Sequence, residues 1–159
     1  LLSALGVKQI SFNNHILLVV NYQSLVEIWR MTENEIARII VEAGYNIHIK
    51  YGPGLYESVY ELILQYELKE KGLLTERQKL ISISHKNLQI ENAFRLDLLV
   101  ENKVIVEIKS IDAFSPIHFK QTITYLKLSD KKLGLLINFN VSKFKDGIRR
   151  FVNKLPEES

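Results

Sequence analysis

Two strongly apolar segments, residues 95–100 and 104–109, are separated by a short polar stretch that begins with Glu101 and Asn102. Their aliphatic and β-branched content predicts two strands joined by a tight hairpin. Segments as apolar as these belong to a buried sheet, yet they also carry charged residues. Because a charge inside a buried sheet must be paired or neutralised, these two strands strongly restrict what the chain can fold into.

The charged residues that matter most are Asp97, Glu107 and Lys109. Residues two apart in a strand share a face, so Glu107 and Lys109 point the same way. Pairing around the turn brings Asp97 opposite a residue near 106, and therefore close to Glu107. Two neighbouring carboxylates in a half-buried sheet repel each other, and a divalent cation removes that cost. The competing interpretation is a surface strand with a chance Glu-x-Lys alternation.

Composition restricts which metal such a pair of carboxylates could hold. The chain has no cysteine, which excludes disulfides, thiolate metal sites and thiol chemistry. Its four histidines show no close ligand spacing. Any metal must therefore be held by oxygen or imidazole, and an oxygen-ligated hard cation, Mg²⁺ or Mn²⁺, is the kind of metal that such a composition could hold.

The remaining elements follow from capping signals and periodicity, in the order α-α-β-β-β-α-β-α. Thr32 and Glu35 form a capping box that opens the first helix, and Gly72 ends the second. Ser115 and Pro116 open a third helix. The other predicted elements are helices at about residues 55–71 and 115–128, strands at about 79–84, 93–100, 103–110 and 133–139, and a short helix at about 145–153.

The chain of 159 residues is long enough for one domain with a real core. We expect the functional domain at residues 31–154 and a tail at 155–159. Residues 1–30 form either an extension from an upstream start or a weakly ordered arm, and the sequence leaves both open. No apolar run approaches the length of a membrane span, and no secretory signal is recognisable, so a cytoplasmic protein is the default.

Three further polar residues occupy positions of interest. Glu57 lies at the start of the second helix, where the helix dipole favours an anion, although a plain N-terminal acid is an equal alternative. Gln121 and Tyr125 fall on one face of the third helix, and both need hydrogen-bond partners if that face is buried. The residues of that predicted inward face are Ile117, Gln121, Thr124, Tyr125 and Leu128.

Positive charge is concentrated in the last third of the chain. Residues 103–154 contain eleven Lys and Arg against four Asp and Glu, within a net charge of +3 for the whole chain. This local excess could attract a polyanion such as a nucleic acid. A solvated surface is the alternative interpretation.

Several segments in the same order resemble one bacterial family. Residues 54–60 match the GxxExxY signature that names this family of small proteins, and four further motifs follow it. These motifs are RLDLLV at 95–100, VEIK at 106–109, QTITYL at 121–126 and GLLINF at 134–139. The resemblance covers roughly residues 32–153. The family looks like a branch of the PD-(D/E)XK nuclease superfamily, whose core is α-β-β-β-α-β with a mixed sheet between helices.

The resemblance implies an α/β (α+β) fold and a set of functional residues. Asp97 matches the motif aspartate, preceded here by leucine instead of proline, and Glu107 with Lys109 matches the (D/E)xK pair. Metal ligands would be Asp97, Glu107, the carbonyl of Ile108 and Glu57, directly or through water. Gln121 and Tyr125 match the QxxxY element of recombination-exonuclease-like members and would position the site or the scissile strand.

The expected function is therefore hydrolysis of nucleic-acid phosphodiester bonds, with DNA as the expected substrate. A homodimer or a protein partner is a reasonable addition for so small a domain. One alternative is a non-catalytic nucleic-acid-binding or assembly module on the same fold, although a dead site has no reason to keep these buried polar groups. A small-molecule enzyme with residues 52–54 as a phosphate cradle is weaker, because they lack the lysine and spacing of a P-loop.

Overall fold

A five-stranded mixed sheet with strand order β3-β4-β5-β6-β7 forms the centre of the fold. The computed structural model describes residues 8–12, 15–19 and 31–154. All neighbouring strands of this sheet are antiparallel except β5 and β6, which are parallel. The strands are β3 (Thr75–His85), β4 (Leu88–Val100), β5 (Val104–Lys109), β6 (Leu133–Asn138) and β7 (Ile148–Val152).

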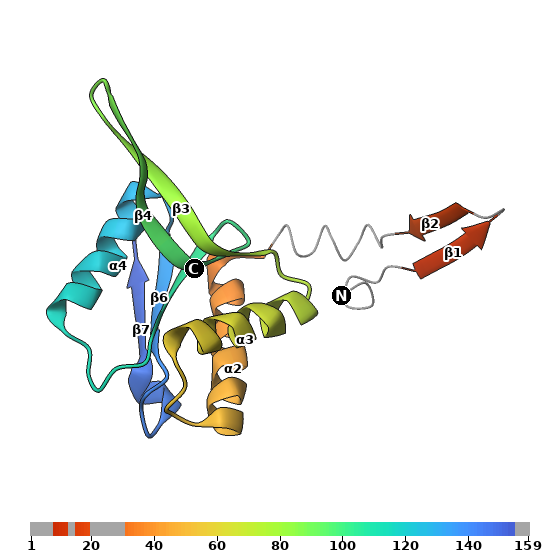
Figure 1. Cartoon of the computed structure of the whole chain (residues 1–159), viewed down its shortest axis with the longest axis horizontal. Helices are drawn as coiled ribbons and strands as arrows, with labels where there is room; N and C mark the ends of the chain where they lie inside the picture. The colour runs from red at the N-terminus through yellow and green to blue at the C-terminus, as the bar shows by residue number, and fades with distance from the viewer. Residues whose placement is uncertain (1–7, 13–14, 20–30, 155–159) are drawn as a thin grey trace.

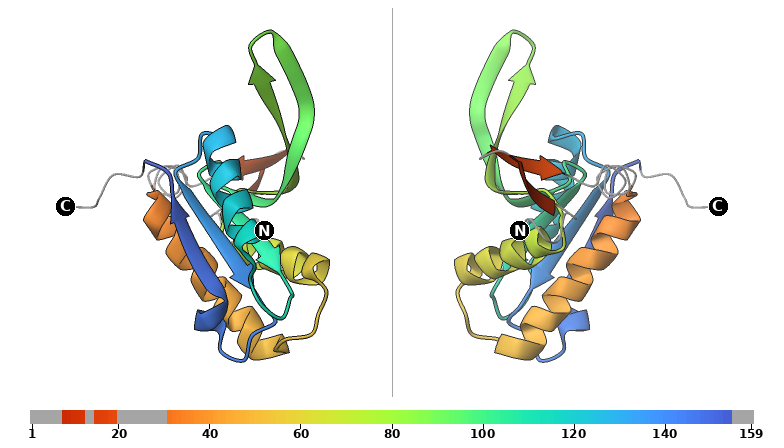
Figure 2. Two further views of the ribbon diagram at one scale, coloured as in Figure 1. Left: turned by 90° about the vertical axis from the view of Figure 1, so that its left-hand side faces the viewer. Right: turned by 90° about the vertical axis from the view of Figure 1, so that its right-hand side faces the viewer.

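Helices cover both faces of the sheet. The helices α2 (Glu33–Tyr51) and α3 (Glu57–Glu70) lie on one side, and α4 (Pro116–Leu128), which links the parallel strands β5 and β6, lies on the other (Figures 1 and 2). The larger apolar core fills the α2/α3 side, and a smaller core around Leu96, Leu99, Ile105 and Leu126 fills the α4 side. This arrangement confirms the predicted α+β class and the α-β-β-β-α-β core.

The local signals in the sequence mark the element boundaries well. Thr32 and Glu35 form the reciprocal capping box of α2. Gly72, with a φ of 86°, follows the end of α3, and Ser115 precedes Pro116 at the start of α4. Glu101 and Asn102 both have a φ of 52°, so they make the tight turn between β4 and β5 that such left-handed residues favour.

The predicted helix at residues 145–153 is wrong. A short 3₁₀ turn, η1 (Phe144–Gly147), leads instead into the edge strand β7. β7 pairs with β6 from Leu133↔Val152 to Ile137↔Ile148, so it satisfies backbone groups of a fully buried strand that would otherwise lack partners. This long-range need outweighs the helical pattern of a short segment.

The predicted inward face of α4 is also wrong in part. Ile117 and Leu128 are 62% and 46% exposed, and the buried residues of the helix are Thr122 and Leu126. Both buried side chains lie against Gly134 of β6, where a Cβ atom would meet them at 3.3 Å. The small glycine lets the helix approach β6 along this line, which rotates Ile117 and Leu128 outward.

β3 and β4 extend beyond the rest of the sheet as a two-stranded arm (Figure 1). Both strands are longer than predicted from the apolar pattern, because residues 82–93 are largely exposed and show no buried face. The arm contains a register shift between Ile81 and Ile83. Only the base of this hairpin, near Leu96–Val100, belongs to the buried sheet.

The N-terminal segment contains two short strands. β1 (Lys8–Phe12) and β2 (His15–Val19) pair antiparallel, from Lys8↔Val19 to Phe12↔His15. The other residues of segment 1–30 and the predicted tail at 155–159 lie outside the described residues, so the domain boundaries remain predictions. In the part of the chain that the structure describes, no helix is long and apolar enough to cross a membrane.

Replacing Gly147 with alanine is expected to destabilise the domain by at least about 2 kcal/mol. An added Cβ would lie 2.1 Å from the backbone oxygen of Asn138, which cannot move without disturbing β6. Urea unfolding measures the loss. Gly134→Ala serves as the control, because its Cβ meets only side-chain atoms at 3.3 Å and is expected to cost less. Equal losses in the two variants would contradict this reading of η1.

Candidate active site

The site begins where β4 and β5 stop pairing. The backbone ladder between them runs from Val100↔Val104 to Leu98↔Val106 and ends there. The next backbone donor on β5, the N–H of Ile108, donates instead to Oδ2 of Asp97 at 2.8 Å. The Asp97 carboxylate therefore takes the place of a backbone partner between two strands that diverge.

The regular alternation of side chains along β4 is broken at Asp97. Leu98 packs in the larger core on the α2/α3 side, whereas Leu96 packs with Leu99 and Ile105 in the smaller core on the α4 side. Regular alternation would put Leu96 and Leu98 on one face. The break lies at Asp97, and it explains why this carboxylate reaches the edge of β5 instead of standing on either face.

Glu107 is the most perturbed acid among the described residues. It is 3% exposed, and its Oε1 atom has no hydrogen-bond partner among them. Burial, followed by the negative charge of Asp97, raises the pKa of Glu107 from 4.5 to about 8, against the opposing effects of the Lys109 charge and the Asp97 backbone N–H. A buried polar atom without a partner is rare and calls for an explanation.

Asp97 and Lys109 complete the centre of the site. Burial raises the pKa of Asp97, while the Ile108 N–H and the Lys109 charge act in the opposite direction. Lys109 therefore lies within electrostatic reach of both carboxylates. The structure brings Asp97, Glu107 and Lys109 together, as their spacing predicts.

Glu57 approaches the site from the start of α3. Its Oε1 atom accepts a hydrogen bond from the N–H of Ser110 at 3.0 Å, just after the end of β5. The hydroxyl of Ser110 donates in turn to the carbonyl of Leu55 at 2.8 Å. The negative charge of Glu57 is close enough to act on the pKa of Asp97. A hollow of about 650 Å³ lies beside this contact, lined by Gly54, Leu55, Tyr56, Glu57, Ser58, Ser110 and Asn140.

Gln121 and Tyr125 contact each other on α4. The Gln121 side chain donates to the Tyr125 hydroxyl at 2.5 Å, and the Tyr125 ring stacks on Phe94 of β4 with centroids 4.4 Å apart. Both residues are half-buried. They lie on the side of the sheet that Ile105 faces, and by alternation Glu107 faces that side as well. No hydrogen bond joins them to Asp97 or Glu107 in the described structure.

Sequence reasoning missed one residue that shapes the loop after β5. Asn138, 1% exposed, stands beside Lys109 in the parallel pairing of β5 and β6. Its side chain donates to the carbonyl of Ile111 at 2.7 Å and accepts from the N–H groups of Ile111 and Asn140, both at 3.1 Å. The available signal was an amide near the end of an otherwise apolar strand.

Glu61 was missed as well. It lies four residues after Glu57 on α3 and is 4% exposed, although the sequence pattern gave it no role. Its carboxylate accepts hydrogen bonds from Gln78 and Arg77 of β3. The spacing of four from Glu57, among buried apolar neighbours, could have predicted that both acids face the strands.

The oxygen donors of Asp97 and Glu107 suit a divalent cation that prefers oxygen ligands. Two carboxylates, one with an unpartnered buried oxygen, stand beside each other, and a cation would relieve both the burial and the repulsion. Among the described residues no group of three His, Cys, Asp or Glu side chains is close enough to form a ready metal cluster. Further donors would therefore come from backbone oxygen and water.

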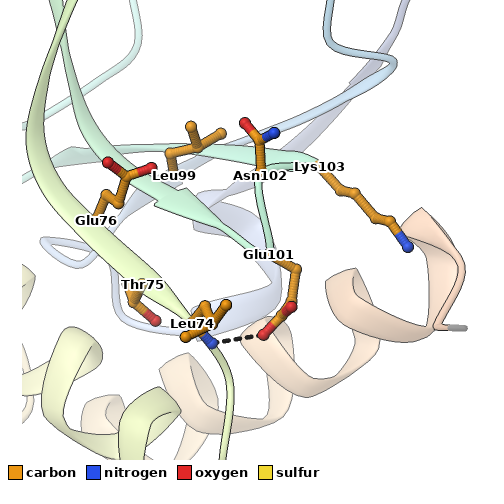
Figure 3. Close-up of a pocket in the computed structure, with 7 residues that line it drawn as sticks. All are labelled: Leu74, Thr75, Glu76, Leu99, Glu101, Asn102 and Lys103. Carbon is orange, nitrogen blue, oxygen red and sulfur yellow. Dashed lines mark hydrogen bonds between the residues drawn. The ribbon is translucent and has the colours of Figure 1, made fainter. Parts of the chain in front are cut away.

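A second hollow, of about 540 Å³, lies apart from these residues (Figure 3). Its lining residues are Leu74, Thr75, Glu76, Leu99, Glu101, Asn102 and Lys103. Glu101 accepts a hydrogen bond from the N–H of Leu74 at 2.5 Å (Figure 3). It also donates its own N–H to the Leu74 carbonyl at 2.8 Å. None of the predicted site residues lines it, so we assign it no part in the chemistry.

A mixed sheet with two carboxylates and a lysine on the adjacent strands β4 and β5 is consistent with a nuclease-like fold. The family model described as the PD-(D/E)XK nuclease superfamily matches residues 34–151, which is most of the chain. The protein therefore belongs to the PD-(D/E)XK nuclease superfamily, as the motifs predicted. Its place in the GxxExxY branch remains a prediction. No curated protein and no solved structure matches the chain significantly.

Proposed function

We propose that this protein is a metal-dependent nuclease that hydrolyses phosphodiester bonds, with DNA as its substrate. The observation that carries the proposal is the buried Glu107 carboxylate beside Asp97, with one oxygen unpartnered and Lys109 next to both. Buried like charges are costly, and strongly perturbed acids of this kind are typical of functional sites. Membership of a nuclease superfamily supports the same conclusion.

Mg²⁺ or Mn²⁺ would be held by Asp97, Glu107 and the carbonyl oxygen of Ile108. Glu57, whose carboxylate contacts the Ser110 N–H, would act on the ion through a water molecule. When bound, the cation supplies Lewis-acid polarisation of a phosphate oxygen and lowers the pKa of the attacking water. The protein contributes a fixed pair of carboxylates, and a bound cation would relieve the repulsion between them.

The remaining site residues act on the water and the substrate. The Lys109 ammonium orients the attacking water and stabilises the negative charge that develops on the phosphate in the transition state. Gln121 and Tyr125, already bonded to each other, hold the scissile strand or the site in position. Stacking of Tyr125 on Phe94 fixes that pair relative to β4, the strand that carries Asp97.

Basic side chains of the C-terminal third would hold the nucleic-acid backbone. Lys120 and Lys127 on α4, and Arg149 and Arg150 on β7, are exposed. Such contacts neutralise phosphates without reading sequence. We therefore propose binding that depends on salt and not on base sequence. A cytoplasmic setting and a dimer or protein partner remain predictions.

Cleavage assays on single- and double-stranded DNA test this function directly. With Mn²⁺ or Mg²⁺ the protein is expected to cut at least one of these substrates, and EDTA is expected to abolish cutting. RNA of the same sequence serves as the comparison that separates the two nucleic acids. If none of these nucleic acids is cut, the catalytic proposal fails whether or not calorimetry detects Mn²⁺ binding, and a non-catalytic binding module takes its place.

A further inference from the structure

Helix α3 is attached to the strands of the site at two points one helical turn apart. Glu57 accepts the N–H of Ser110 beyond β5, as described above. Glu61 accepts from the Gln78 side chain through both carboxylate oxygens, each at 2.8 Å, and from Arg77 at 3.2 Å. A carboxylate that is 4% exposed does not serve solubility, so these contacts to β3 need another explanation.

Gln78 lies directly across from Asp97. The pairs Arg77↔Leu98 and Lys79↔Leu96 flank these two residues on β3 and β4, while no regular pairing joins Gln78 to Asp97 themselves. The φ of Gln78 is 54°, in the left-handed region, although the residue lies within a strand and not in a turn. Backbone strain of this kind persists only where the surroundings enforce it, and it concentrates at functional sites.

The strained residue of β3 therefore coincides with the break in β4. The side chains of β4 switch from one face of the sheet to the other at Asp97. The neighbouring strand β3 can stay paired with β4 only if the backbone of β3 also departs from regular strand geometry there. The Gln78 side-chain amide donates to the Glu61 carboxylate, so this irregular part of β3 is held to α3. The negative charge of Glu61 also reaches Glu107, since it contributes to raising the pKa of that acid.

We propose that Glu61 and Gln78 are positioning residues of the site: their hydrogen bond holds β3 and β4 in the irregular conformation that presents Asp97 beside Glu107. This inference rests on the nuclease function proposed above. Without the bond, β3 and β4 would relax toward regular alternation, and the Asp97 carboxylate would leave the Ile108 N–H.

The test swaps the amide of Gln78 and the carboxylate of Glu61 between the two positions. Gln78→Glu places two carboxylates together and is expected to lower both kcat and Mn²⁺ affinity about 10- to 100-fold, the usual effect of losing a residue that orients metal ligands. KM for the DNA substrate is expected to change much less. Adding Glu61→Gln to that variant restores one carboxylate–amide pair and is expected to recover at least about tenfold of the loss, a rescue that general damage would not show.

Gln65→Glu is the matched control. Gln65 also joins α3 to β3, by donating to the Thr75 carbonyl at 3.3 Å, but it lies further along the helix, away from Asp97. This variant is expected to lower the melting temperature while kcat and Mn²⁺ affinity stay near wild type. If Gln65→Glu reduces kcat and Mn²⁺ affinity as much as Gln78→Glu, or if the double variant recovers nothing, the positioning role is overturned.

The same variants separate failure of this inference from failure of the proposed function. If the wild type cuts DNA and Gln78→Glu cuts equally well, only the positioning role is refuted. If the wild type binds Mn²⁺ without cutting any nucleic acid, the nuclease proposal fails, and Mn²⁺ affinities of the variants still decide the positioning role. If the wild type neither cuts nor binds Mn²⁺, both proposals are overturned.

Discussion

Lys109→Ala is expected to lower the rate of DNA cleavage by about 10²–10³-fold while leaving Mn²⁺ binding within a few fold of wild type. In the proposed mechanism the lysine acts on the water and on the charge that develops at the phosphate, and it is not itself a metal ligand. Removing its positive charge from beside two carboxylates also leaves the cation site more negative, which favours metal binding. Single-turnover cleavage and calorimetry measure the two quantities separately.

Asp97→Asn gives the complementary result. It keeps the shape of the side chain but removes one of the two charges, so both cleavage and Mn²⁺ binding are expected to be lost together. Lys71→Ala, a change of the same kind as Lys109→Ala but at an exposed position at the end of α3, is the control and is expected to cut at nearly the wild-type rate. Full activity of Lys109→Ala would show that the proposed centre is misplaced.

In the absence of metal, Glu107→Gln is expected to make the protein more stable than wild type at pH 8. The pKa of Glu107 is about 8 in the folded protein against 4.5 for the ordinary group. The folded state therefore keeps a proton that the unfolded chain releases between these pH values, so the stability of the wild type falls as pH rises from about 4.5 to about 8. The size of the shift sets an upper limit of about 5 kcal/mol at pH 8.

Urea unfolding in EDTA, from pH 5 to pH 8.5, measures this dependence. Asp97 contributes in the same direction because its pKa is also raised. Glu91→Gln, on the exposed arm, is the control and is expected to follow the wild-type curve. Saturating Mn²⁺ is expected to reverse the order by stabilising the wild type and not Glu107→Gln. A wild type that gains stability between pH 5 and pH 8 without metal would refute the assignment of Glu107.

The proximity of Asp97, Glu107 and Lys109 could be predicted from sequence because it depends on local geometry. These residues lie on two strands joined by a tight turn, and the short turn brings Asp97 close to Glu107. Capping residues such as Thr32 and Ser115 fixed helix starts for the same reason. Features of this kind depend on a few neighbouring residues and on no distant contact.

The features that sequence reasoning missed depend on distant partners. β7 exists because β6 needs a neighbour, and α4 turns Thr122 and Leu126 inward because Gly134 leaves room for them. The spacing of Glu61 from Glu57 indicates which way its side chain faces, but its partner Gln78 on β3 becomes known only from the structure. The reversal of β4 at Asp97 likewise has no local signal, since Leu96 and Leu98 look equivalent in the sequence.

The hydrogen bonds by which Asn138 holds the loop after β5 have a consequence for folding during synthesis. The acids Glu57, Asp97 and Glu107 all precede Asn138 in the chain, yet the loop after Lys109 is held by Asn138 at the end of β6. A growing chain that has not yet delivered β6 has its acids but nothing to fix the segment that Glu57 must meet at Ser110. The site is therefore expected to take its final arrangement only after β6 has been synthesised and has paired with β5.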